Sequence, residues 1–455
     1  MSRIEQVSVT KLFGTVDHEV NFRQNEPTIL LAPNGAGKTH VLKLTAAALS
    51  LDARTLLMTI YESLTIRFVD GRELCVARTV LESGRAQVSI VAKPVGAQND
   101  PLVLSEEDLD SLGQIAPEIR QVGPNRWTDE RTGRSFTRSE VERRFRVSTR
   151  PVADKLEGFG EIAALCGPPS PVFIDTWRLD SRAEDSAMLG GWGRATPRSD
   201  SSAASRIRNY AENLREEIAE ARRSSIRVTQ SADLSFAARA LEAANLRVNE
   251  ASLQKRYSET VERYAALARN GLAVGDAPIA FPPKTTPTVR RILSVFLDDW
   301  DQRLVPLLPV NEKLQTLRDI LDSKLAPSGK TTAFSARGGL EFYSASGRRL
   351  PLSRLSSGEQ HLVALFTLLL FAAKKGSLVL IDEPEISLHA AWKHSFLQDI
   401  SRVAGVNGLQ IVLATHSAGI VNGRWDLTEE LALRVDLGET ASLDTNLDDE
   451  DDLDA

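Results

Sequence analysis

The 455-residue chain alternates between short apolar runs and longer segments of helical periodicity. Alternating apolar and polar residues predict a strand at 4–9 and a hairpin at 65–78, turned by an Asp-Gly pair. Four other runs are almost wholly apolar, as is typical of strands buried on both faces of a parallel sheet. These runs are 28–31, 171–176, 378–381 and 409–414. The pattern predicts an α/β fold with a buried parallel sheet and an antiparallel β-subdomain.

Helical periodicity dominates the middle of the chain, where apolar residues recur at three- and four-residue steps. The stripes occupy 207–221, 253–268, 289–300 and 314–325. Antiparallel packing of the first two helices would make a short coiled-coil arm, and a compact helical bundle fits the pattern equally well. Two or three heptads are too few for a long coiled coil. Acidic residues after Ser105 also predict a short helix at 105–112.

A glycine-rich loop follows the first buried strand, and a helix begins directly after it. The loop follows the phosphate-binding P-loop pattern, with Ala32 in place of the usual first glycine. Gly35 and Gly37 allow the backbone to approach phosphate oxygens. Lys38 would reach the β- and γ-phosphates, and the Thr39 hydroxyl would ligate Mg²⁺. The nucleotide-binding residues expected from this motif are Asn34, Gly35, Ala36, Gly37, Lys38, Thr39 and His40.

Two adjacent acids, Asp382 and Glu383, stand at the carboxyl end of the buried strand at 378–381. Ligands of parallel sheets bind just beyond these strand ends. Asp382 would hold Mg²⁺, and Glu383 would orient or deprotonate an attacking water. Taken alone, a buried strand capped by solvated acids explains the pair equally well. The P-loop in strand–loop–helix context favours the nucleotide site.

Two further motifs can contact phosphate. The turn that begins at Ser356 opens an apolar helix, whose unpaired N–H groups can bind an anion. His416 follows the strand at 409–414 and could donate a hydrogen bond to a γ-phosphate. A lone histidine is usually structural, and only the order of the motifs favours the phosphate contact. His389 is a weaker candidate, because packing alone explains it.

The order P-loop, LSSGEQ, VLIDEPEISLH and LATHS resembles the ATPase head of the ABC superfamily, in its SMC and RecF-like branch. Within that branch the chain looks like the ATPase subunits of bacterial anti-phage systems of the PtuA and AriA types. The resemblance implies a helical insert, with ATP and Mg²⁺ as cofactors. It also implies that LSSGEQ contacts the γ-phosphate held by a second head, so that ATP joins two heads. The residues of that contact would be Ser356, Ser357, Gly358 and Glu359.

The resemblance divides the chain into four parts. These are ATPase lobe one at 1–180, the helical insert at 181–330, ATPase lobe two at 331–437 and an acidic tail at 438–455. The family commonly has a glutamine that senses the γ-phosphate and the metal after the strand at 171–176. None follows here before Asp180, so no residue is assigned that role; Asp175 and Arg178 are candidates, and capping of the strand also explains Asp175.

Composition restricts the possibilities only a little further. Two cysteines without metal-ligand spacing, no apolar run of about 20 residues and no signal peptide favour a cytoplasmic protein without a membrane anchor. The net charge is −6, and the last ten residues hold six acids, so the remainder is near neutral. Arginines at 120–150 could contact phosphates, although a solvated face is the simpler interpretation. Bulk charge therefore neither supports nor excludes DNA.

Two classes of function fit this picture. The first is a homodimeric or higher homo-oligomeric defence ATPase, a sensor and scaffold for a separate effector such as a nuclease or toxin. A partner in trans is expected because the chain after Ser417 is too short for a nuclease domain. The second is a DNA-repair or chromosome-maintenance ATPase that clamps DNA. The helical insert disfavours a transporter subunit.

Overall fold

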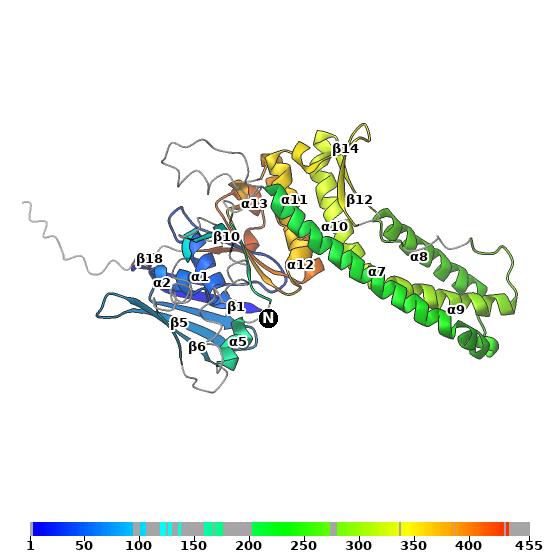
Figure 1. The fold of residues 1–455 in the computed structure, drawn as a ribbon, viewed down its shortest axis with the longest axis horizontal. Coiled ribbons are helices and arrows are strands. Elements are labelled where there is room, and N and C mark those ends of the chain that lie inside the picture. The colour runs from blue at the N-terminus through cyan, green and yellow to red at the C-terminus, as the bar shows by residue number, and fades with distance from the viewer. Residues whose placement is uncertain are drawn as a thin grey trace, which may run out of the picture.

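The computed structural model describes a head built around two sheets and a helical arm that projects from it (Figure 1). The described residues are 3–93, 101–105, 119–123, 126–129, 135–137, 159–166, 169–175, 203–273, 280–335, 338–386, 388–431 and 434–435. Most of the arginine-rich stretch, residues 176–202 and the acidic tail lie outside them. Among the described residues, no helix combines the length and apolarity that crossing a membrane requires.

The central sheet is parallel, in the order β11-β15-β16-β3-β17. Its strands are β3 (Thr28–Leu31), β11 (Val172–Asp175), β15 (Leu378–Asp382), β16 (Gln410–Thr415) and β17 (Thr428–Glu430). Asp175 pairs with Asp382, which pairs with Ala414, while Thr415 pairs with Leu31. The carboxyl ends of β3, β11, β15 and β16 carry the predicted site residues and therefore lie at the same side of the sheet. These strands come from both ends of the chain.

An antiparallel sheet of seven strands lies beside the central one, in the order β18-β2-β1-β4-β5-β6-β7. Its strands are β1 (Ile4–Leu12), β2 (Val16–Asn21), β4 (Ser63–Phe68), β5 (Glu73–Val80), β6 (Ala86–Lys93), β7 (Leu102–Ser105) and β18 (Arg434–Val435). The predicted strand at 4–9 and hairpin at 65–78 are confirmed. The predicted helix from Ser105 is wrong at its start, because Ser105 pairs with Gln87 as the last residue of β7.

Alternate residues of the central strands enter two different cores. Leu30, Leu380 and Val412 pack with α1 (Lys38–Ser50) and the antiparallel sheet. Ile29 and Leu413 face the other way, into a core formed with α10 (Leu308–Leu325), α11 (Ser357–Thr367) and α12 (Ala390–Asn407). Burial on both faces explains why these strands are uninterrupted apolar runs. The fold is α/β, as predicted, with a buried parallel sheet and an antiparallel sheet beside it.

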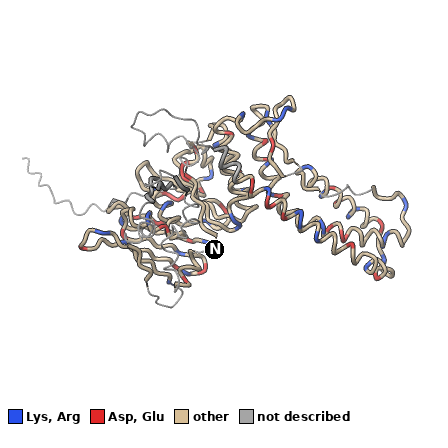
Figure 2. Tube along the Cα trace, viewed as in Figure 1, with Lys and Arg blue, Asp and Glu red and all other residues tan. Residues whose placement is uncertain are grey.

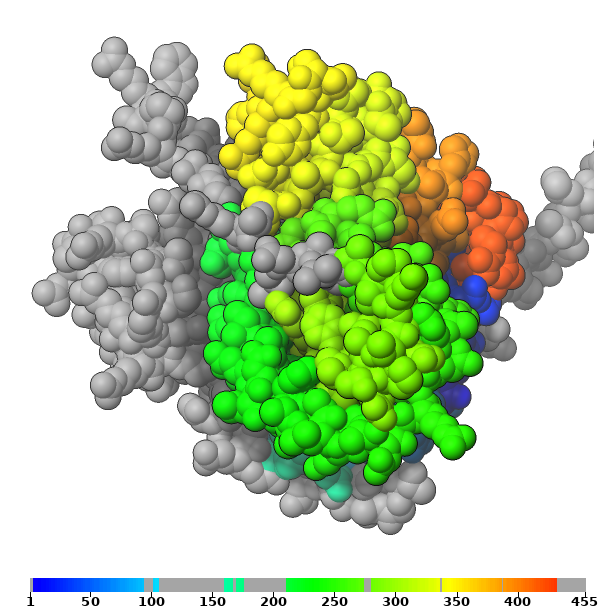
Figure 3. All heavy atoms as spheres, turned by 90° about the vertical axis from the view of Figure 1, so that its right-hand side faces the viewer, coloured from blue at the N-terminus to red at the C-terminus, as the bar shows by residue number. Residues whose placement is uncertain are grey.

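The helices between β11 and β12 (Lys330–Phe334) are α7 (Ala203–Glu242), α8 (Glu250–Arg269), α9 (Pro287–Leu304) and α10. The first part of α7 packs on α11 and buries Leu214 and Ile218 in the head. The rest of α7 leaves the head and packs on α9, which also pairs with α8. Figure 3, viewed along the arm, shows these three helices gathered in front of the head.

The arm is therefore a three-helix bundle, and α10 belongs to the head. Tyr257 of α8 and Leu297 of α9 share a small apolar core, and Arg256 forms a 2.7 Å ion pair with Asp301. The sequence left open a coiled-coil hairpin and a bundle. The pairing of α9 with both α7 and α8 favours the bundle.

Smaller elements complete the described fold. They are α2 (Ala53–Met58), β8 (Ile119–Gly123), β9 (Arg126–Asp129), β10 (Ser135–Thr137), α5 (Gly160–Cys166), β13 (Leu340–Ser344), β14 (Arg349–Leu350) and α13 (Ala418–Val421). A π-helical turn, η6 (Leu368–Ala372), continues α11, and a 3₁₀ turn, η7 (Pro384–Ile386), follows β15. The first turn adjoins α11, the helix that begins within the LSSGEQ motif, and the second adjoins the acid pair Asp382 and Glu383.

Candidate nucleotide-binding site

The P-loop forms an open cradle at the N-terminus of α1. Gly37 caps the helix at φ 92° and offers no side-chain cap, so the first N–H groups of α1 are not occupied by a capping side chain. Gly35 is exposed at φ 85°, and a Cβ there would meet no atom within 4 Å. Lys38 is buried and donates hydrogen bonds from Nζ to the carbonyls of Ala32 (2.7 Å) and Pro33 (3.3 Å). Unoccupied N–H donors at a helix N-terminus suit a phosphate.

The hairpin of β1 and β2 supports this cradle from below. A Cβ added to Gly37 would lie 2.6 Å from Leu12 Cδ2, so only glycine fits between the loop and the hairpin. His18 of β2 contacts the carbonyl oxygen of Ala36 through Nε2 at 2.6 Å. Burial lowers the pKa of His18, against the opposing effects of this contact and of Asp17. No motif in the sequence around His18 predicts this support.

Asp382 and Thr39 come together at the edge of the sheet. Asp382 is 5% exposed, and burial is the main cause that raises its pKa, with smaller contributions from Glu383 and Asp175. A hydrogen bond with the Thr39 side chain and the charge of Lys43 act in the opposite direction. Oδ1 of Asp382 is buried without a hydrogen-bond partner. A buried carboxylate oxygen without a partner, beside a threonine hydroxyl, is a donor set that fits Mg²⁺.

Glu383 adopts a backbone conformation that side chains rarely accept. Its φ is 44°, in the left-handed region, and its N–H donates to the carbonyl of Ala414 at 2.8 Å. The conformation turns the chain sharply after β15 and leaves the Glu383 side chain 28% exposed. Left-handed non-glycine residues concentrate at functional sites, where surrounding structure maintains the strain.

His416 lies beside Glu383 and above a second acid, Glu385. His416 Nδ1 is 3.8 Å from Glu383 Oε1 and 3.2 Å from Glu385 Oε1. Glu385 Oε1 also accepts hydrogen bonds from Thr415 Oγ1 at 2.7 Å and from the His416 N–H at 3.0 Å. The sequence analysis did not predict Glu385 as a site residue. A second acid two positions after the proposed catalytic one was the only available signal.

Phe13 is a third residue that was not predicted from the sequence. Its side chain is 43% exposed, and its ring meets that of His40 edge-on at 4.8 Å between centroids. Burial, and next the charge of Lys43, lower the pKa of His40. An exposed aromatic face beside a phosphate loop can stack on a nucleobase. The Phe-Gly turn after the first strand gave a turn signal but no reason to expect a ligand there.

The turn of the LSSGEQ motif at 355–360, which we call the signature turn, differs from the P-loop because its polar groups are paired with one another. The Ser356 hydroxyl accepts a hydrogen bond from the Glu359 N–H at 3.3 Å, and Glu359 Oε2 accepts one from the Ser356 N–H at 2.7 Å, a complete capping box. Lys330 adds a 2.7 Å ion pair to the same Glu359 oxygen. Ser356 and Ser357 are exposed, while Glu359 is buried. The turn thus offers serines and Gly358 at its surface, and the predicted nucleotide contact by Glu359 would require this ion pair to open.

The signature turn and the P-loop do not meet within one chain: no hydrogen bond or ion pair joins them among the described residues. His389 caps α12 by accepting from the Ala391 N–H at 3.3 Å, a structural role. Asp175 lies 3.9 Å from Lys43, and position 178 is outside the described residues.

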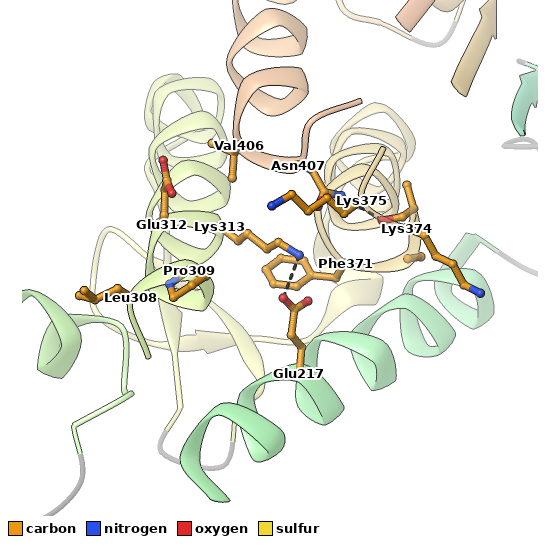
Figure 4. Close-up of a pocket in the computed structure, with 12 residues that line it drawn as sticks. Glu217, Leu308, Pro309, Glu312, Lys313, Phe371, Lys374, Lys375, Val406 and Asn407 are labelled. Atoms are coloured by element: carbon orange, nitrogen blue, oxygen red, sulfur yellow. Dashed lines mark hydrogen bonds and ion pairs between the residues drawn. The ribbon is translucent and has the colours of Figure 1, made fainter. Parts of the chain in front are cut away.

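A hollow of about 690 Å³ lies elsewhere, where the arm joins the head (Figure 4). Lys375 extends across it, and Lys313 pairs with Glu217 at 2.8 Å. None of the predicted site residues lines this hollow.

The parallel sheet, the P-loop cradle and the acid-tipped strand β15 define an α/β fold with a candidate nucleotide-binding site at the carboxyl ends of its strands. Residues 198–422 match the family model described as "AAA domain, putative AbiEii toxin, Type IV TA system". This match covers the arm, the signature, the acids and His416, and begins after the P-loop. No curated protein matches the chain.

Solved structures similar to this chain include three SMC heads. The head bound to the C-winged helix domain of ScpA is 13% identical, with 92% of this chain and 90% of that chain covered and a TM-score of 0.35. The head from Thermotoga maritima is 10% identical, with coverage of 94% and 92% and a TM-score of 0.32. The head with a coiled coil and joint from Pyrococcus yayanosii is 14% identical, with coverage of 92% and 93% and a TM-score of 0.34.

Proposed function

We propose that this protein binds ATP with Mg²⁺ and hydrolyses it. The observation that carries the proposal is the proximity of Asp382 to the Thr39 side chain, which brings the acid strand against the helix that follows the P-loop at one sheet edge. A triphosphate in the cradle would meet free N–H donors, the Lys38 ammonium and this carboxylate together. That combination of groups fits a phosphate chain and its metal ion.

Thr39 and Asp382 would hold Mg²⁺, and phosphate oxygens and water would fill its remaining positions. When bound, the ion neutralises charge on the phosphates. Glu383 would orient the attacking water and accept its proton, because its partly exposed carboxylate stands just beyond the strand end. His416, 3.8 Å from Glu383, would donate a hydrogen bond to the γ-phosphate. Phe13 would stack on the base.

Two substitutions test these roles. Lys38→Ala should weaken ATP binding at least about 100-fold in calorimetry, because it removes the ammonium from the phosphate cradle. Glu383→Gln should keep ATP binding and lower phosphate release about 100-fold or more. Glu82→Gln, on the exposed β5–β6 turn, makes the same chemical change far from the site and should alter neither. Unchanged affinity in the first variant, or unchanged turnover in the second, would contradict the proposal.

We further propose that two heads pair around ATP. Ser356, Ser357 and Gly358 lie at the exposed N-terminus of α11, where a second copy's γ-phosphate could be bound. The separation of this turn from the P-loop within one chain supports sharing between two chains. Native mass spectrometry of Glu383→Gln should show a dimer that needs ATP and Mg²⁺. A monomer under those conditions would exclude the shared site.

For the biological role we favour an ATPase that controls a separate effector in anti-phage defence. The matching family's description names a putative AbiEii toxin of a type IV TA system, and so associates similar domains with such a system. The alternative is a DNA-clamping ATPase of the SMC or RecF-like kind. The distribution of charges on the arm gives this alternative less support. Charges of both signs alternate along it (Figure 2), and Arg223 and Arg227 pair with Glu220.

Co-purification with the product of an adjacent gene would support the effector role. Tight, salt-sensitive binding of long DNA without such a partner would favour the clamp instead.

A further inference from the structure

Glu385 is a buried acid that neither the metal ligands nor the water-activating role requires. Its side chain is 3% exposed. Among the described residues no lysine or arginine lies within ion-pair distance of it, and the one ionisable nitrogen that does is His416 Nδ1, at 3.2 Å. A buried carboxylate is costly unless a positive group is paired with it. Among the described residues, the His416 ring is therefore the ionisable group that is paired with Glu385.

All the polar contacts of Glu385 converge on one oxygen. Oε1 faces the Thr415 hydroxyl, the His416 N–H and the His416 ring, whereas Oε2 is buried without a hydrogen-bond partner. The hydrogen bond from its N–H fixes the backbone of residue 416, and the Nδ1 edge of its ring lies 3.2 Å from the same oxygen. The remaining ring nitrogen, Nε2, has no hydrogen-bond partner among the described residues, and the His416 side chain is 49% exposed.

We propose that Glu385 is the positioning residue of His416. The Glu385 carboxylate holds a proton on His416 Nδ1, so that His416 Nε2 can carry a second proton to the γ-phosphate. The proposal rests on the ATPase function proposed above. Which ring nitrogen of a histidine is protonated depends on the partner of the other nitrogen. Here both described carboxylates near the ring, those of Glu385 and Glu383, lie on the Nδ1 side.

The negative charge of Glu385 matters when phosphate arrives. The ring then lies between two anions and takes up one proton from solvent, which it returns when phosphate leaves. A buried carboxylate stabilises the resulting imidazolium and an amide does not, as in other acid–histidine pairs. Glu385 thus acts through His416 and touches neither nucleotide nor water.

Kinetics can separate this role from a merely structural one. Glu385→Gln should lower kcat for ATP about 100-fold with little change in KM, which is the expected loss for one donor to a developing charge. His416→Gln should lower kcat to the same extent, and the double variant no further, since both changes remove one interaction. Glu82→Gln is the control for the acid-to-amide change. If Glu385→Gln lowers kcat equally in the presence and absence of His416, Glu385 does not act through the histidine.

Nitrogen-15 NMR of histidine-labelled protein provides a readout that needs no turnover. The His416 signal, identified by its absence from His416→Gln, should show the Nδ1 proton in the nucleotide-free protein and lose that preference in Glu385→Gln. A proton on Nε2 instead, or an unchanged signal in Glu385→Gln, would overturn the proposal. If wild-type protein binds no ATP but shows the Nδ1 proton, the ATPase function fails while the pairing stands.

A second variant covers the case in which Glu385→Gln does not fold. Thr415→Val keeps the side-chain volume and the Glu385 charge but removes the 2.7 Å hydroxyl donor that orients the carboxylate. It should lower kcat less than tenfold and broaden the His416 signal. Thr415→Ser, which restores the hydroxyl, should recover both. Equal behaviour of the valine and serine variants would count against the positioning role.

Discussion

The two halves of the candidate site differ in how completely their polar groups are satisfied. At the sheet edge, Glu383 has a left-handed backbone, the cap of α1 has no side-chain partner and a buried oxygen of Asp382 has no hydrogen bond. At the signature turn, Ser356 and Glu359 cap each other, and Lys330 pairs with the buried carboxylate. The sheet-edge half therefore retains backbone strain and polar groups without partners, whereas the polar groups of the signature turn are paired without a ligand.

This difference suggests a division of work. Groups left strained or without partners gain most when phosphate and metal bind, because the ligand supplies the missing contacts. A turn that presents serines to a second subunit must instead be rigid beforehand, since ordering it on contact would reduce affinity. Substitutions that remove a contact of the signature turn should therefore lower the free energy of unfolding. Substitutions that remove strain at the sheet edge should raise it.

The largest effect should come from removing Lys330. Lys330→Met leaves Glu359 buried with hydrogen bonds only from Ser328 and the Ser356 N–H, and should reduce the free energy of unfolding by about 3 kcal/mol. Urea unfolding followed by circular dichroism measures it. Lys374→Met is the control, because Lys374 is exposed and has no ion pair among the described residues. Equal stability of the two variants would show that the ion pair contributes nothing.

Acid should diminish this difference. Burial acts to raise the pKa of Glu359, but Lys330, the Ser356 N–H and Ser328 together hold that pKa below its ordinary value. A carboxyl with a lowered pKa in the folded state stabilises the protein above its unfolded-state pKa. That contribution is lost as the pH falls through the lower folded value. The gap between wild type and Lys330→Met should therefore be full at neutral pH and narrow below about pH 4.

A smaller effect should follow from removing the cap. Ser356→Ala loses the hydroxyl that accepts the Glu359 N–H and should lower the free energy of unfolding by about 1 kcal/mol. Ser357→Ala, one residue inside the helix, removes a similar hydroxyl without a capping role and should cost less than about 0.5 kcal/mol. Thermal or urea unfolding of both variants checks the comparison. If Ser357→Ala is the more damaging change, the capping box is not what stabilises the turn.

The sequence predicted the central sheet well because doubly buried strands leave continuous apolar runs, as at 28–31 and 378–381. It also predicted the four helical stripes of the insert. It could not decide between a hairpin and a bundle, since that choice depends on which helix covers a given stripe. The pairing of α7 with α9, across the intervening α8, has no local signal.

The site shows the same limit. Local motifs placed the P-loop, the acid pair and His416 in the sequence, and sheet register brings their strand ends together. Glu385, His18 and Phe13 were missed because their roles depend on contacts made across the fold, to Thr415, Ala36 and His40. Glu359 was predicted as a nucleotide contact because the motif contains it. Its partner Lys330 lies 29 residues earlier in the chain, and no local pattern connects them.

A difference of similar size tests the strained half directly. Glu383→Gly and Glu383→Ala both remove the carboxylate, so both should abolish turnover equally. Only glycine adopts a φ of 44° without steric cost, whereas alanine retains the Cβ clash of the left-handed region. The glycine variant should therefore be about 1 kcal/mol more stable than the alanine variant in urea unfolding, the reverse of their usual order. An alanine variant as stable as the glycine variant would mean that the turn after β15 carries no strain, and the contrast between the two halves would then rest on the partnerless oxygen of Asp382 and the uncapped α1.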